Sequence, residues 1–218
     1  MNDGGHVALR ALKRLSAELL PTSWLVRHGP SDRPAVALTF DDGPDAHTLA
    51  LLDALDAHRL VATFFVVGRQ VERFPEAARA IVERGHEIAS HSWAHDRVGT
   101  LSVAAHARDL ARVQAILPRA SRRRPLYRPP WGDVTPRTLA TTAALGYTTA
   151  LWSLDSLDHR PIGREGIARQ LASHRPRPGD VVLLHEGEAE TRAALADVAA
   201  LLAADGLGTA QMSDLLGG

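Results

Sequence analysis

The sequence predicts an α/β fold, a single barrel-like domain of parallel strands with helical crossovers. Short apolar runs alternate with segments of helical spacing, and strands in such a series form parallel sheets. Roughly seven units follow one another without a break in composition, which favours a barrel over a doubly wound sheet. Ionisable residues also recur at the ends of the expected strands, where parallel α/β barrels carry their chemistry.

Residues 1–34 are expected to form an amphipathic helix and a connection ahead of the main domain at residues 35–218. In residues 6–20, apolar side chains fall on one face and basic ones on the other. A surface helix packed on the protein is the simpler interpretation, and an interfacial membrane helix is the alternative. The prolines and glycine of residues 21–34 indicate an irregular connection.

Seven segments have the short, apolar or β-branched character of strands. They are residues 35–40, 62–67, 87–90, 126–128, 147–154, 180–184 and 207–211. Helical spacing predicts helices between them, over residues 46–58, 71–84, 102–117, 136–145, 164–173 and 190–204. Ser102 and Thr135 are expected N-caps, while Gly85 and Gly146 are expected to end helices.

Composition excludes several classes of partner and site. With 25 basic and 25 acidic residues, the net charge is zero, and nothing indicates a nucleic-acid partner. The chain has no cysteine, so disulfides and Cys-ligated zinc are excluded, and any metal must bind His, Asp or Glu. We see neither a run of about 18 apolar residues nor a secretory apolar segment. A cytoplasmic monomer is therefore expected, with peripheral membrane association as the alternative.

Five of the expected strands are followed by ionisable residues. They are Asp41 and Asp42, His91 and His95, Arg128, Asp155, and His185. Since the carboxyl ends of barrel strands meet at one rim, these groups are expected to lie close together. That regularity is a stronger signal than any single motif.

Two histidines and one carboxylate with an open fourth position are typical of a catalytic zinc site. His91 and His95 supply the imidazoles, although a pair at this spacing often arises by chance. Asp41 and Asp42 supply two carboxylates, so one can ligate while the other acts as general base on water. The alternative for Asp-Asp-Gly-Pro is an ordinary turn. Spacing alone does not assign the two roles.

Six segments carry a family resemblance. They are LTFDDGP (38–44), ATFFVVG (62–68), GHEIASHSWAH (85–95), YRPPWG (127–132), WSLDSLD (152–158) and LLHE (183–186). In order and spacing they resemble the motifs of polysaccharide deacetylases, the NodB homology group or carbohydrate esterase family 4. The group includes chitin, chitooligosaccharide and peptidoglycan N-acetylglucosamine deacetylases. The resemblance covers about residues 35–216 and implies a distorted (β/α) barrel of seven or eight strands.

The resemblance implies a role for each residue at the metal. Asp41 is the general base, and Asp42, His91 and His95 hold one divalent ion. Zinc is the usual metal, with Co²⁺, Ni²⁺ or Mn²⁺ as alternatives.

Four further roles also follow from the resemblance. Arg128 orients the base, and the backbone N–H of Trp131 helps to hold the oxyanion. His185 is the general acid that protonates the leaving amine, and Asp155 tunes His185.

The implied reaction is hydrolysis of an N-acetyl, or alternatively O-acetyl, group from an acetylated glycan, with release of acetate. One alternative is a hydrolase of another C–N bond, such as an imide or formamide. The least favoured alternative is a non-catalytic, metal-containing carbohydrate-binding protein. The sequence departs from the family at His159, where Trp is usual, and at Glu186, where Asp is usual. Both departures bear on substrate preference.

The four tryptophans separate into two groups. Trp93 lies between the two metal histidines and Trp131 follows the Arg-Pro-Pro turn. Both are expected at the rim, where they either stack on a pyranose or fill the barrel mouth. Trp24 and Trp152 are assigned to packing.

Overall fold

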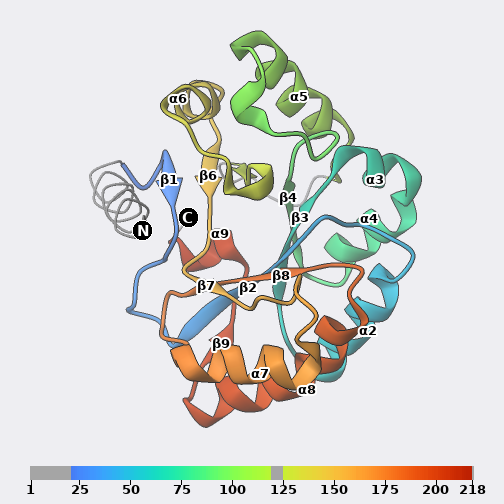
Figure 1. Cartoon of the computed structure of the whole chain (residues 1–218), viewed down its shortest axis with the longest axis vertical. Coiled ribbons are helices and arrows are strands. Elements are labelled where there is room, and N and C mark those ends of the chain that lie inside the picture. Colours follow the sequence, from blue (N-terminus) through green and yellow to red (C-terminus); the bar gives the residue numbers. More distant parts are fainter. Residues whose placement is uncertain (1–20, 119–124, 218) are drawn as a thin grey trace, which may run out of the picture.

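The strands form one parallel sheet curled into an open barrel with helices outside (Figure 1). A computed structural model describes residues 21–118 and 125–217. Neighbouring strands follow the order β1-β6-β5-β4-β3-β2-β8-β7, and β9 pairs with β2 off this path. All of these pairings are parallel, which confirms the predicted fold class.

The element bounds are as follows. The strands are β1 (Leu25–Val26), β2 (Ala35–Asp41), β3 (Ala62–Val66), β4 (Glu87–Ser90), β5 (Leu126–Tyr127), β6 (Thr148–Ala150), β7 (Leu154–Asp155), β8 (Val181–His185) and β9 (Gly208–Thr209). The helices are α2 (Thr48–Ala57), α3 (Gly68–Arg73), α4 (Pro75–Glu83), α5 (Val103–Ile116), α6 (Pro136–Ala144), α7 (Gly163–His174), α8 (Ala189–Ala204) and α9 (Met212–Leu215). Two 3-10 turns, η1 (Val98–Thr100) and η2 (Pro130–Gly132), complete the set.

Alternation along the strands separates an outer core from the barrel interior, because successive strand residues point to opposite faces. Leu38 and Phe40 of β2 belong to the apolar cluster that also contains residues of the outer helices. Ala37 belongs to a second cluster, together with Phe65 of β3. Thr39 and Asp41 follow Ala37 at a spacing of two, so β2 turns both of these polar side chains inward.

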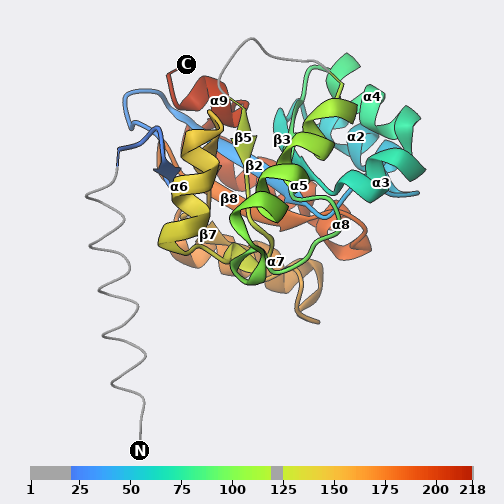
Figure 2. The same ribbon diagram turned by 90° about the horizontal axis from the view of Figure 1, so that it is seen from above.

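Helix α9 closes the barrel at the amino ends of the strands (Figure 2). The backbone N–H of Met212 donates to Thr63 Oγ1 (2.8 Å), and that of Ser213 donates to Glu87 Oε2 (3.1 Å). Thr63 lies near the start of β3 and Glu87 begins β4, while Met212 and Leu215 pack in the inner apolar cluster. With one end filled in this way, the carboxyl ends of the strands are left to form the site.

Several helix ends lie where capping residues and glycines predict them. Ser102 accepts a hydrogen bond from the N–H of Ala105, and Thr135 forms a capping box with Thr138. Gly85 and Gly146 follow α4 and α6 with φ of 82° and 83°, a conformation that glycine adopts without steric cost. All four predicted boundaries are therefore confirmed.

Three elements differ from the prediction. The helix expected over residues 71–84 is two helices, because Pro75 starts α4 at a position where its missing N–H costs nothing. The strand expected over residues 147–154 is also two strands. Its middle crosses the open side of the barrel: Leu151 N–H donates to Val26 O on one edge, and Ser153 N–H donates to Val181 O on the other.

The connection expected over residues 21–34 contains β1, which pairs with β6, so the sheet begins ahead of residue 35. The expected helix over residues 6–20 lies outside the described residues. The same holds for most of residues 120–125, whose basic sequence ASRRRP predicts a solvated loop. Within residues 21–118 and 125–217, no helix combines the length and apolar character needed to cross a bilayer.

Candidate metal centre and active site

The residues that the sequence singles out meet at the carboxyl ends of the strands. Asp41 ends β2, Asp155 ends β7 and His185 ends β8. His91 directly follows β4, and Arg128 directly follows β5. Parallel pairing places these ends on one side of the barrel, so the predicted rim is present.

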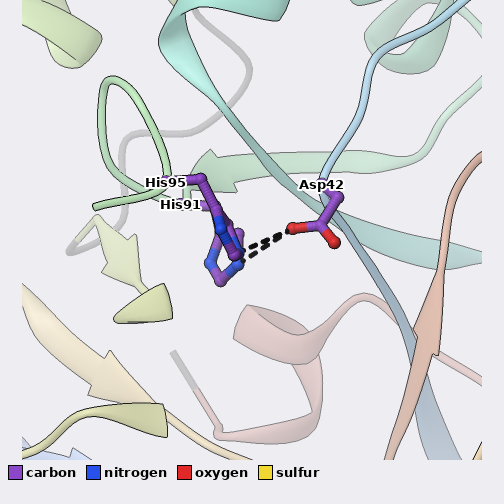
Figure 3. Close-up of side chains that lie close together, drawn as sticks. All are labelled: Asp42, His91 and His95. Carbon is purple, nitrogen blue, oxygen red and sulfur yellow. Dashed lines mark ion pairs between the residues drawn. The ribbon is translucent and has the colours of Figure 1, made fainter. Parts of the chain in front are cut away.

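Asp42, His91 and His95 converge on one point (Figure 3). Asp42 Oδ1 lies 3.4 Å from His91 Nε2 and 3.0 Å from His95 Nε2. One ligand atom from each residue lies within 4.8 Å of the other two, which is the spacing needed to hold a metal ion. Asp41 stands next to this group, with its Oδ2 3.8 Å from His91 Nε2.

The donor set fits a divalent cation. Asp42 Oδ1 is buried and makes no hydrogen bond, an arrangement that is costly unless a cation compensates it. The Nδ1–H of His91 donates to the carbonyl of Arg128 at 2.8 Å, which leaves the Nε2 lone pair for a metal. Burial acts to raise the pKa of Asp42, but the interactions with His91 and His95 outweigh it and hold that pKa well below its usual range.

The backbone of the loops at the site adopts uncommon dihedral angles. Asp42, Ser92, His95 and Trp131 all have positive φ, between 60° and 78°, which is uncommon for residues other than glycine. Side chains stabilise this loop geometry, since the N–H of His95 donates to Ser92 Oγ (2.9 Å). Strained backbone of this kind concentrates at functional sites.

The carboxylate of Asp109 holds the middle of the loop that joins His91 to His95. Asp109, on α5, accepts the backbone N–H of Trp93, which lies between the two histidines, at 2.9 Å. Burial raises the pKa of Asp109 to about 6, although the bond from Trp93 and the charge of Arg112 oppose the rise. No local motif links α5 to the loop, so the spacing of residues along the chain does not predict this contact.

Arg128 occupies the barrel interior with no exposed surface. Its Nη1 donates to Asp41 Oδ1 at 2.7 Å and to Thr39 Oγ1 at 2.8 Å. Its Nε and Nη2 donate to the carbonyls of Ala150 and Leu151, both at 3.2 Å. Burial lowers the pKa of Arg128, and the charge of Asp41 opposes that change. A guanidinium stays protonated even so, and this one fixes the Asp41 carboxylate in place.

The partner of His185 is Asp158, so the predicted pairing with Asp155 is wrong. His185 Nδ1 lies 2.7 Å from Asp158 Oδ1, and the backbone N–H of His185 donates to Asp158 Oδ2 at 2.7 Å. The carboxylate of Asp155 instead accepts the N–H of Leu157 (2.9 Å) within the turn after β7. That turn, with Leu157 at φ 59°, carries the chain back over the end of β8. The repeat Ser-Leu-Asp-Ser-Leu-Asp offers two candidate aspartates, and spacing does not choose between them.

The contact with Asp158 sets the protonation state of His185. Burial opposes the charge on His185, but the hydrogen bond and charge of Asp158 raise its pKa to about 9, with further contributions from Asp41 and Asp42. Burial likewise acts to raise the pKa of Asp158, and the bonds from His185 and Thr191 lower it overall. His185 is therefore an imidazolium at neutral pH.

Glu186 lies fully packed behind the aspartate pair. Its backbone N–H donates to Asp41 O (2.9 Å), and its Oε2 accepts from Thr48 Oγ1 (2.5 Å). A Cβ added to Gly43 would fall 1.7 Å from Glu186 Oε1. The side chain of Glu186, which is longer than that of the usual Asp, therefore fits only because residue 43 is glycine. Burial raises the pKa of Glu186 to about 8, although the bond from Thr48 opposes the rise.

Only one of the two tryptophans expected at the rim is open to a ligand. Trp131 is 64% exposed, and its ring lies 5.1 Å from that of His95. Trp93 is buried at 6% exposure, with its ring 3.3 Å from the guanidinium carbon of Arg112 and packed against Gly68. Its predicted part in sugar stacking is therefore wrong. Trp24, assigned to packing, is 39% exposed.

Comparisons with known proteins agree with the motifs. The family model described as polysaccharide deacetylase matches residues 28–150. A peptidoglycan-N-acetylglucosamine deacetylase of Bacillus cereus is 33% identical over 208 residues, which cover 93% of this chain and 97% of that protein. A chitooligosaccharide deacetylase of Bradyrhizobium sp. is 39% identical over 158 residues, covering 70% and 71% of the two chains.

A solved structure agrees as well. A crystal structure of a peptidoglycan N-acetylglucosamine deacetylase superposes with a TM-score of 0.83 at 27% identity, over 91% of this chain and 97% of that one. The family model, the sequence relatives and the superposed structure all agree with the family indicated by the motifs around the rim. The chain belongs to the polysaccharide deacetylase family.

Proposed function

We propose that the chain hydrolyses the N-acetyl group of N-acetylglucosamine units in a glycan of the peptidoglycan or chitin type, releasing acetate and a free amine. The observation that carries this proposal is the convergence of Asp42, His91 and His95 beside a second, Arg128-bound carboxylate. The relatives named for these two glycan types support the choice of substrate.

We assign the metal to Asp42, His91 and His95, with Zn²⁺ as the first candidate, because two imidazoles and one carboxylate are a typical catalytic zinc set. When bound there, the ion polarises the acetyl carbonyl and makes a neighbouring water more acidic. Co²⁺, Ni²⁺ and Mn²⁺ also accept this donor set, in keeping with the general preference of such metals for imidazole and carboxylate ligands.

Asp41 takes the proton of the attacking water. Arg128 holds one of its oxygens, and the other lies on the side of His91. A carboxylate fixed by a buried guanidinium cannot rotate away, so it is ready to act as general base. The backbone N–H of Trp131 is assigned to the oxyanion that forms on the acetyl oxygen.

His185 gives a proton to the leaving amine. Its pKa of about 9 keeps the imidazole charged at neutral pH, so the proton is present before the substrate binds. Since Nδ1 faces Asp158, Nε2 is the ring nitrogen that serves as acid. The tuning role that the motifs assigned to Asp155 belongs to Asp158 in this proposal.

The test is acetate release from N-acetylglucosamine oligomers and from peptidoglycan, with and without a chelator. We expect activity in the native protein, its loss after metal removal, and its recovery with Zn²⁺ or Co²⁺. Activity on cyclic imides or formamides and none on glycans would instead support the alternative C–N hydrolase. Binding of oligomers without acetate release under any metal would support the non-catalytic alternative.

A further inference from the structure

A second cluster of metal-ligating side chains lies where β7 and β8 end, next to the end of β2. Asp158, His159 and His185 each offer one ligand atom, and these atoms lie within 4.8 Å of one another. The rings of His159 and His185 meet edge to face, with centroids 5.5 Å apart. Among the described residues, only this group and the Asp42 group meet that test. The two groups contain the same set of donors.

We propose that Asp158, His159 and His185 form a second, weaker divalent-metal site. An ion bound there replaces the Nδ1 proton of His185 and blocks deacetylation, because the neutral imidazole that remains has an Nε2–H far less acidic than that of the imidazolium. The blocking effect rests on the proposed role of His185 as acid. The site itself rests only on the positions of the three side chains. Residue 159 completes it, and the family motif usually has tryptophan there.

The carboxylate of the cluster is already oriented as a ligand. Asp158 Oδ2 accepts hydrogen bonds from the backbone N–H of His185 and from Thr191 Oγ1, both at 2.7 Å. Such contacts fix the direction of a ligating carboxylate and leave its other oxygen to the metal. His159 is exposed, so its imidazole is free to turn toward the ion.

Binding exchanges a proton for the metal. Asp158 Oδ1 and His185 Nδ1 now share a hydrogen bond of 2.7 Å. Two ligands of one tetrahedral zinc lie roughly 3.3 Å apart, given bonds of about 2 Å. The pair must therefore separate by roughly 0.6 Å, and the shared proton leaves to solvent as the ion enters. The Asp42 site needs less displacement, because Asp42 Oδ1 already lies 3.4 Å from His91 Nε2 and 3.0 Å from His95 Nε2. The second site therefore fills at a higher metal concentration.

The test is metal stoichiometry of the full chain, measured by equilibrium dialysis against buffered free Zn²⁺ and repeated with Co²⁺. We expect one equivalent at low free metal and a second at a concentration at least roughly tenfold higher. His159→Gln should stop at one equivalent. His174→Gln is the matched control, an exposed histidine on α7, and should bind two. His95→Ala should lose the first equivalent and keep the second.

Acetate release is measured at the same free metal concentrations. We expect native activity to fall at least roughly tenfold as the second equivalent binds, whereas the activity of His159→Gln, whatever its level, should be the same at low and at high free metal. A native protein that stops at one equivalent, or a second equivalent that persists in His159→Gln, would overturn the site. A second equivalent bound with activity unchanged would overturn the blocking role. If no glycan is deacetylated at all, the proposed function fails while stoichiometry still decides the site.

Discussion

Two histidine–aspartate groups lie at the carboxyl ends of the strands, and they differ in what their carboxylates already bind. Asp42 Oδ1 has two imidazole nitrogens within 3.4 Å and no hydrogen bond. Asp158 uses both oxygens, toward the ring and backbone of His185 and the hydroxyl of Thr191. The first arrangement suits a cation, and the second holds a proton on His185. Residue type alone therefore does not set the chemistry of such a pair.

The protein fixes the two groups by different means. Strained loops bring Asp42 and His95 together, since both have positive φ. His185 ends a regular strand, and a turn brings Asp158 to its backbone. The metal group is thus built from loops, while the proton group is anchored to the sheet. The following changes test that division, from the largest expected effect to the smallest.

Asp41→Asn is expected to lower kcat/KM by about 10²- to 10⁴-fold, because the amide cannot accept the water's proton. Metal content should stay at one equivalent, since the ligands are untouched. Acetate release and elemental analysis of the same sample measure both. If Asp41→Asn loses the metal while Asp42→Asn keeps it, the two aspartates exchange roles.

Asp158→Asn is expected to move the alkaline limb of the pH profile to lower pH. A charged partner raises the pKa of His185 to about 9, so its loss returns the imidazole toward its ordinary value near 6.5. The acid must be protonated to act, so activity at pH 8 should fall roughly 30-fold. The control is Asp155→Asn, whose limb should not move. A shift in the control alone would restore Asp155 as the partner of His185.

Gly43→Ala is expected to destabilise the fold by about 1–3 kcal/mol, since its Cβ would overlap Glu186. Activity should fall with it, because Asp42 is the preceding residue. The matched control is Gly208→Ala, where the nearest atom would lie 3.9 Å away. Urea unfolding measures both variants.

A second substitution separates the clash from other effects of Gly43→Ala. Adding Glu186→Asp withdraws the carboxylate by one methylene and should restore part of the lost stability. If the double variant is no more stable than Gly43→Ala, the overlap with Glu186 is not the cause.

Trp131→Ala is expected to have the smallest effect, roughly a 2- to 10-fold loss of kcat/KM on oligomers. Trp131 is 64% exposed, so the midpoint of thermal unfolding should barely change. The backbone N–H assigned to the oxyanion remains in this variant. An unaltered kcat/KM in the folded variant would mean that other residues hold the sugar.

The sequence predicted the features that depend on local signals. The apolar runs that alternate with helical segments predict strands that end near Asp41 and His185, and the structure confirms both ends. The N-caps at Ser102 and Thr135 are confirmed as well. Both kinds of signal depend only on residues that are close together in the chain. Pro75 was a local signal too, but the periodicity of residues 71–84 concealed the break between α3 and α4.

Local sequence patterns do not predict contacts between segments that are distant in the chain. The choice of Asp158 over Asp155 depends on a turn that returns over β8, and both aspartates sit in the same short repeat. The fit of Glu186 against Gly43 joins two loops that are far apart in the chain. Trp93 was placed at the rim from its position between two ligands, although α5 and Arg112 cover it. Each of these depends on tertiary packing, which the spacing of residues does not encode.

The most direct test of the division between the two groups is the metal content of two variants prepared identically at limiting metal. Asp42→Asn is expected to lose the bound ion, and Asp158→Asn is expected to keep one equivalent, although both lose activity. Elemental analysis of purified protein gives the result. Retention of metal in Asp42→Asn, or its loss in Asp158→Asn, would contradict the assignment of the ion to the Asp42 group and of the proton to the Asp158 group.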